Sequence, residues 1–167
     1  MLAKLIVEGK EFDIEILDPK LQELIAPKKK TGYEPVGKNE YYWIVNEESE
    51  LGYVQECGDD EDALFYSTAN YYESEFVAAQ NARADKLMRQ LRRFAVERRK
   101  QNINWDEGDF KYTIRYNHGY GDLYAVKEVG ERNFGCIWFD SKDAIIQAME
   151  TFYDELIWYF TEYRDSL

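Results

Sequence analysis

The chain has 167 residues, 45% of them apolar, and a net charge of −12. A chain of this length and composition buries a core of its own, which excludes a disordered protein and removes the need for a disulfide or metal to hold the fold. Its first residues turn acidic too early for a signal peptide, and no apolar run approaches the roughly 20 residues of a membrane span. We therefore expect a cytoplasmic protein that does not enter a membrane.

Charge is unevenly spread along the chain. Residues 31–80 hold twelve acidic residues and one basic residue, whereas residues 81–100 hold eight basic residues and two acidic ones. An acidic protein is repelled by nucleic-acid phosphates unless a local basic patch dominates, and its field steers it towards basic partners. The acidic segment and the basic segment are therefore both candidates for a binding surface.

The N-terminal segment predicts a hairpin followed by a short helix. Residues 3–8 and 11–16 have strand character, and the second run alternates apolar and acidic side chains strictly. Gly9 and Lys10 fit a two-residue turn between them. Asp18 and Pro19 fit the start of a helix over residues 18–25. Residues 1–27 thus form a first ββα element.

Residues 33–100 predict a second unit. Aromatic and β-branched residues predict strands over 41–45 and 51–55, with an acidic turn between them. Residues 58–62 are expected to form a loop, and residues 64–66 a third short strand. Ser74 is placed to cap a long helix that reaches about residue 100.

Residues 110–167 predict a third unit with the same order of elements. Strands are expected over 112–116, 123–126 and 135–139, and Asp140 and Ser141 then begin a helix that runs to about residue 163. Eight apolar residues recur on it at helical spacing, which is typical of a core-facing stripe.

The two longer units resemble one another. Tyr72 and Ser74 stand before the first long helix as Phe139 and Ser141 stand before the second, at an offset of 67 residues. The sequence leaves open whether this is an internal ββ(β)α duplication or the common chemistry of strand-to-helix junctions. Either way it predicts an α+β fold, in one compact domain, with antiparallel hairpins and two long helices packed on one face.

No residue pattern predicts catalysis. His118, the single histidine, lies in a glycine-flanked turn, and Cys57 and Cys136 have no metal-ligand spacing around them. Residues 59–62 lack the alternating ligands of a calcium loop. We expect no enzyme, no cofactor and no metal.

Two surfaces are candidates for binding a partner. The first is acidic and would imitate a phosphate backbone in a basic groove; its residues are Glu47, Glu48, Glu50, Glu56, Asp59, Asp60, Glu61 and Asp62. The second is the outer face of the helix in residues 83–100, the only phosphate-binding candidate; its residues are Lys86, Arg89, Arg92, Arg93, Arg99 and Lys100. That face is also able to remain solvated, or to pair with the acidic segment within the molecule or across a homodimer.

The stretch from Lys30 to Glu34, the aromatic run 41–44 and the Phe139–Ser141 junction resemble small accessory proteins of phages and prophages of Gram-positive bacteria, over residues 30–165. The resemblance implies a phage product that acts in the host cytoplasm, where acidic members inhibit defence nucleases. Our first hypothesis is thus an inhibitor of a host defence protein, such as a CRISPR nuclease. A nucleic-acid or nucleotide-binding module using the basic helix is the second, and a phage structural or assembly protein, seen as a homo-oligomer, is the third.

Overall fold

A computed structural model of the chain describes residues 2–7, 10–15, 17, 30–100, 108–130 and 133–163. Contacts divide the chain into two units, Met1–Thr31 and Gly32–Leu167. The described residues form four α-helices and three antiparallel hairpins, which confirms the α+β class. None of these helices is both long enough and apolar enough to cross a membrane.

The N-terminal unit contains one hairpin. Strand β1 (Leu2–Val7) pairs with β2 (Lys10–Glu15), and the register ends at Val7 opposite Lys10. Lys10 therefore belongs to a strand and not to the turn, one residue away from the prediction. The helix expected over residues 18–25 lies outside the described residues.

The second hairpin begins the larger unit and has the predicted bounds. Strand β3 (Tyr41–Val45) pairs with β4 (Leu51–Gln55), with Tyr41 opposite Gln55 and Val45 opposite Leu51. Tyr42 is fully buried while its neighbour Tyr41 is exposed. This alternation is the one that a half-buried strand requires.

Helix α2 (Asp60–Ser67) occupies the segment predicted to be a loop and a third strand. That prediction was wrong because residues 59–62 form a capping box. The Asp59 carboxylate accepts hydrogen bonds from the backbone N–H groups of Glu61 and Asp62 at 3.0 and 3.1 Å. Three acidic residues in the first turn also stabilise the helix, because their charges interact favourably with the positive end of its dipole.

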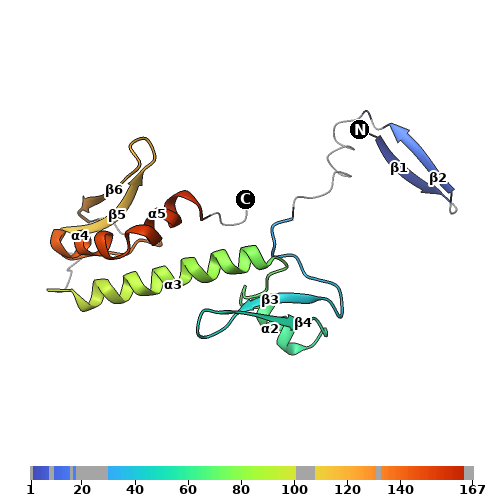
Figure 1. The fold of residues 1–167 in the computed structure, drawn as a ribbon, viewed down its shortest axis with the longest axis horizontal. Helices are drawn as coiled ribbons and strands as arrows, with labels where there is room; N and C mark the ends of the chain where they lie inside the picture. Colours follow the sequence, from blue (N-terminus) through green and yellow to red (C-terminus); the bar gives the residue numbers. More distant parts are fainter. Residues whose placement is uncertain are drawn as a thin grey trace. The chain divides into compact units, whose positions relative to one another are not determined.

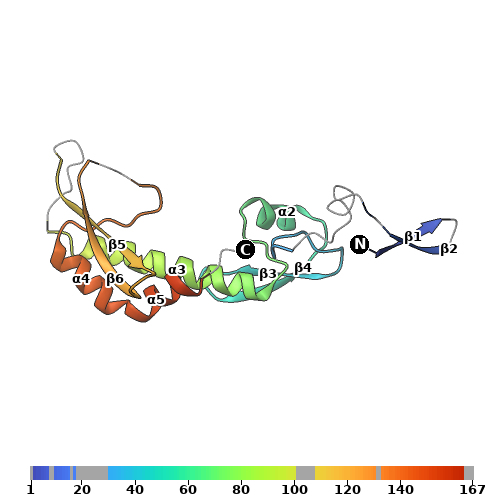
Figure 2. The same ribbon diagram turned by 90° about the horizontal axis from the view of Figure 1, so that it is seen from above.

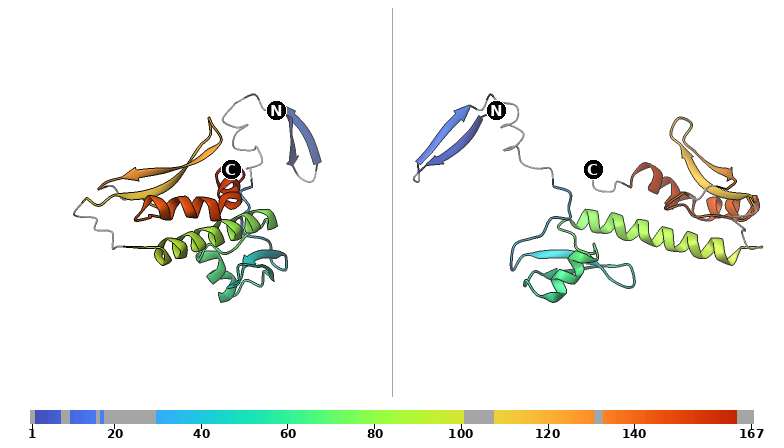
Figure 3. Two further views of the ribbon diagram at one scale, coloured as in Figure 1. Left: turned by 60° about the vertical axis from the view of Figure 1, so that its left-hand side comes forward. Right: turned by 180° about the vertical axis from the view of Figure 1, so that it is seen from behind.

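Helix α3 (Glu75–Glu97) connects the two halves of the larger unit (Figure 1). Ser74 caps it as predicted, since its hydroxyl accepts a hydrogen bond from the Val77 N–H. The helix contacts β3 and β4 on one side and the C-terminal helices on the other (Figure 3). Both halves therefore share one helix.

The third hairpin pairs β5 (Lys111–Asn117) with β6 (Asp122–Glu128) (Figure 2). The strand predicted over 135–139 is absent apart from a single bridge between Phe139 and Tyr112. Gly135 has φ +78°, in the left-handed region, which an extended strand does not allow. In the described part of the chain each hairpin is a separate two-stranded sheet, so the helices do not cover one continuous sheet face.

The predicted C-terminal helix is two helices, α4 (Lys142–Thr151) and α5 (Tyr153–Thr161), that meet at Phe152. The Thr151 hydroxyl donates to the Gln147 carbonyl at 2.7 Å, an interaction that bends helices. The Phe152 ring packs edge-on against Phe94 of α3, with centroids 5.5 Å apart. The core of this half joins the apolar faces of α3, α4 and α5 and includes Leu87, Leu91, Phe94, Phe139, Ile145 and Leu156.

The two halves of the larger unit share one local design. In each, the first strand of the hairpin bridges a residue that stands two positions before a serine helix cap. Trp43 bridges Tyr72 before Ser74, and Tyr112 bridges Phe139 before Ser141. Duplication as the origin of this design stays a prediction.

Candidate functional site

The eight acidic residues of the predicted surface fall into two groups. Glu47, Glu48 and Glu50 lie at the tip of the β3–β4 hairpin, whereas residues 56–62 follow its other end. The five-pair ladder between the two groups is about 14 Å long. We call the first group the acidic tip and the exposed residues of the second, Asp59, Asp60 and Glu61 with half-buried Glu56, the acidic end.

Asp62 is buried and does not belong to an exposed acidic surface. One of its oxygens accepts a hydrogen bond from the Tyr42 hydroxyl at 2.7 Å. The other accepts from the backbone N–H groups of Cys57, Gly58 and Asp59. The Tyr42 hydroxyl and these three amides hold the pKa of the Asp62 carboxyl at about 2, against the opposing effect of burial. Asp62 therefore organises the loop and is unavailable to a partner.

Glu56 is also tied into the fold. Its carboxylate accepts a hydrogen bond from the Tyr71 hydroxyl at 2.8 Å and from the Gly58 N–H at 2.9 Å. Burial raises the pKa of Tyr71 to about 12, and the bond to Glu56 adds to this effect. The rings of Tyr71 and Tyr42 stack with centroids 3.9 Å apart, so the two carboxylates are held by one aromatic pair.

The remaining carboxylates of the acidic end are presented by a fixed backbone. Asp60 and Glu61 are exposed in the first turn of α2, and Asp59 caps the helix. A surface cavity of about 310 Å³ lies beside them, between Pro35, Glu56, Asp59, Tyr66 and Tyr71. The preorganised loop keeps these charges together without the cost of ordering long flexible side chains.

An exposed tyrosine pair lies at the same end of the hairpin. Tyr41 and Tyr53 are 56% and 68% exposed, and their rings meet edge-on with centroids 5.7 Å apart. Tyr41 stands opposite Gln55, the residue before Glu56. The sequence points to exposed tyrosine and tryptophan near the acidic cluster without identifying these two. The hairpin register identifies them, because it brings positions 41 and 53 to one face.

The acidic tip lies beside the basic helix. The Arg89 guanidinium donates a hydrogen bond to the hydroxyl of Ser49, which stands between Glu48 and Glu50. This hydrogen bond brings one cation of the basic face close in sequence to two glutamates of the acidic tip, but its acceptor is a neutral hydroxyl. The positive charge of Arg89 nearby weakens the negative field of the acidic tip.

Several cations of the predicted phosphate-binding face have partners within the chain. Arg93 pairs with Glu97 at 3.7 Å, and the Lys100 ammonium lies 3.6 Å from Asp143. Arg99 and Lys100 follow the end of α3, so they continue the face only in part. Lys86, Arg92 and Arg99 are exposed.

Few groups suited to chemistry come together in the structure. His118 is exposed in the β5–β6 turn with its ring against Tyr116. Cys57 and Cys136 are both exposed, and Cys136 lies in the segment that was expected to be a strand. Among the described residues, no three His, Cys, Asp or Glu side chains are arranged to hold a metal ion.

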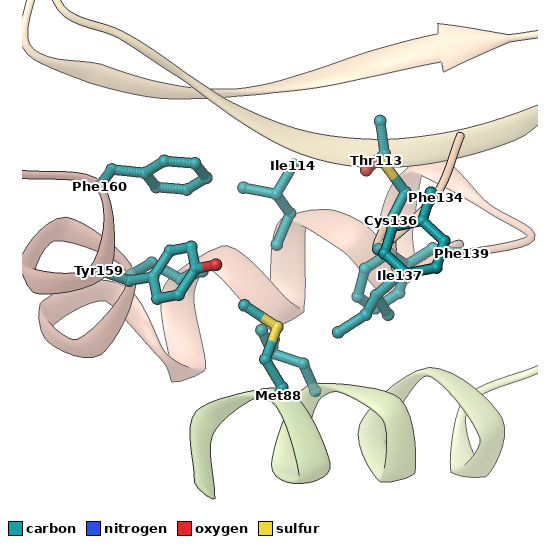
Figure 4. Close-up of a pocket in the computed structure, with 12 residues that line it drawn as sticks. Met88, Thr113, Ile114, Phe134, Cys136, Ile137, Phe139, Tyr159 and Phe160 are labelled. Carbon is teal, nitrogen blue, oxygen red and sulfur yellow. The ribbon is translucent and has the colours of Figure 1, made fainter. Parts of the chain in front are cut away.

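An apolar cavity of about 300 Å³ lies in the C-terminal half (Figure 4). Met88 of α3, Ile114 of β5 and Tyr159 of α5 line it, together with Cys136 and Ile137 of the segment before α4.

Comparison of the chain with protein-family models, with curated proteins and with solved structures finds no match.

Proposed function

We propose that this chain is a non-catalytic, phage-encoded protein that acts in the host cytoplasm and inhibits a host defence protein, of the CRISPR nuclease class, by occupying a basic nucleic-acid groove. The observation that supports this most is the acidic end. Three exposed carboxylates there stand on one capped helix turn, and the turn is held in place by the buried Asp62.

The chemistry of the acidic end suits a groove lined by arginine and lysine. Carboxylates that replace phosphates release the same condensed counterions, so binding becomes strongly salt dependent. Tyr41 and Tyr53 add exposed aromatic faces against which a guanidinium packs favourably. Aromatic residues of this kind are frequent energetic anchors of protein interfaces.

The test separates the exposed carboxylates from the structural ones. Asp60→Asn with Glu61→Gln removes two charges that have no role in the capping box. We expect this variant to bind a purified nuclease–guide complex roughly threefold to tenfold more weakly than the native chain does at low salt, and its affinity to depend less steeply on salt. Titration by fluorescence anisotropy measures both quantities.

The matched control is Glu150→Gln with Glu162→Gln, which changes the net charge equally at two exposed positions in the C-terminal half. The control should bind as the native chain does. Equal affinity for both variants would contradict the proposal, as would unchanged nuclease activity at saturating chain concentration. Binding of DNA or RNA by the free chain would instead direct attention to the basic face of α3.

A further inference from the structure

The outer edge of β5, on the side away from β6, has backbone N–H and C=O groups that form no hydrogen bond with the described residues. Tyr112 exchanges two hydrogen bonds of 2.9 Å with Phe139, so its N–H and C=O point away from β6. Because this direction alternates along a strand, the N–H and C=O of Ile114 and Tyr116 point to the same side. No described residue forms a hydrogen bond with them there.

The first half of the unit shows what normally closes this position. Val45 stands two residues after the bridged Trp43, as Ile114 stands two residues after Tyr112. The Asn70 amide accepts a hydrogen bond from the Val45 N–H at 2.8 Å and donates one to the Val45 carbonyl at 2.9 Å. An amide group therefore completes the edge of β3.

The same position before α4 is occupied by a residue that has no amide in its side chain. Asn70 stands two residues before Tyr72, and Ile137 stands two residues before Phe139. The isoleucine side chain lines the apolar cavity instead. At Ile114 and Tyr116, the outward backbone N–H and C=O groups of β5 therefore have no hydrogen-bond partner among the described residues, whereas Asn70 supplies one to β3.

The apolar cavity lies next to this edge. Ile114 contributes its side chain to the cavity, between Met88 of α3 and Tyr159 of α5 (Figure 4). Its volume of about 300 Å³ is sufficient for one large apolar side chain. Recognition of an added strand uses these two components together, since backbone bonds give affinity and a pocket for a side chain gives specificity.

We propose that β5 binds an extended segment of a partner protein as an additional strand, paired with Ile114 and Tyr116, with one bulky apolar side chain of that segment in the cavity. The Asn70 amide of the first half shows the chemistry required: a donor and an acceptor of the peptide type. An apolar small molecule would fill the cavity but leave these backbone groups unpaired.

Charge argues against a second copy of the chain as the occupant. Each copy has a net charge of −12, which opposes self-association, whereas a segment with basic flanks is attracted. The proposed strand site lies in a different half of the unit from the acidic end and does not depend on it. Asp60→Asn with Glu61→Gln is therefore expected to leave binding at β5 unchanged.

A synthetic peptide tests the backbone component. The probe has about ten residues, with alternating Thr and Val, one central Phe, and Lys at both ends. Two further versions carry N-methyl groups on alternate backbone amides, one version for each edge of the peptide. Because β5 pairs with one edge only, we expect one version to bind about tenfold more weakly or worse, and the other to bind as the parent does.

Protein variants test the cavity. Cys136→Trp places a large side chain at an exposed position that lines the cavity, and Cys57→Trp is the matched control at an exposed cysteine elsewhere. The first should weaken binding of the Phe peptide about tenfold, and the second should not. Hydrogen exchange provides an independent readout: the Ile114 and Tyr116 amides exchange fast in the free chain and slow when the peptide binds, whereas Thr113 and Arg115 are slow in both.

Several outcomes would overturn the proposal. These are equal affinity for the parent and both N-methylated peptides, equal affinity of the two tryptophan variants, or no binding of the parent peptide. A free chain that is already a dimer, with the Ile114 and Tyr116 amides protected, would show that a second copy occupies the edge.

Discussion

At the scale of single residues, the Tyr42–Asp62 pair holds the second hairpin and α2 together. Tyr42→Phe removes the 2.7 Å hydrogen bond to the buried carboxylate, which we expect to lower the free energy of unfolding by about 1–3 kcal/mol. Urea unfolding near neutral pH measures this loss. Tyr41→Phe, at the exposed neighbouring position, is the control and should change it little.

The same hydrogen bond makes the free energy of unfolding depend on pH. The pKa of Asp62 is lowered from 3.8 to about 2 in the folded chain, so its stabilising contribution is present above the ordinary value and is lost as the pH falls through the folded one. In Tyr42→Phe the pKa should rise towards 3.8, because the hydroxyl is the largest cause of the shift. Carboxyl titration by NMR measures the change; an unchanged pKa would contradict the role assigned to Tyr42.

At the scale of elements, the capping box decides that residues 60–67 are a helix. Asp59→Ala removes the acceptor for two backbone N–H groups and should lower the free energy of unfolding by about 0.5–2 kcal/mol. Asp59→Ser retains a capping acceptor and should recover most of this loss. Asp60→Ala, which removes a charge from the same turn but no capping bond, is the control. Equal losses for Asp59→Ala and Asp60→Ala in urea unfolding would contradict the capping role.

At the scale of the whole molecule, α3 is shared by both halves of the larger unit, so the halves should unfold together. Leu87→Ala opens a cavity in the C-terminal core and should lower the free energy of unfolding by about 2–5 kcal/mol. Hydrogen exchange should report the same loss for the slowest amides of β3 and of β5, although Leu87 belongs to the core of one half. A loss confined to β5 would show that the halves unfold separately.

The sequence predicted much of the fold because much of it depends on local chemistry. The alternation of residues 41–45 and 51–55 determined a hairpin, and Ser74 with the helical spacing of Leu87, Leu91 and Phe94 determined α3. In each half the prediction of a hairpin followed by a long helical segment was correct, whereas both predicted third strands were wrong. The helix α2 was readable as well, from the spacing of Asp59 and Asp62, but the acidic run was interpreted as a solvated loop.

Which charged residues are available to a partner depends on contacts between residues that are distant in sequence. Composition could not distinguish buried Asp62 from exposed Asp60, because the difference arises from Tyr42, which is distant in sequence. Nor could it separate the acidic tip from the acidic end, or place Arg89 beside Ser49. The open edge of β5 was hidden for the same reason: strand pairing joins residues far apart in the chain, so composition and periodicity alone do not determine where it stops.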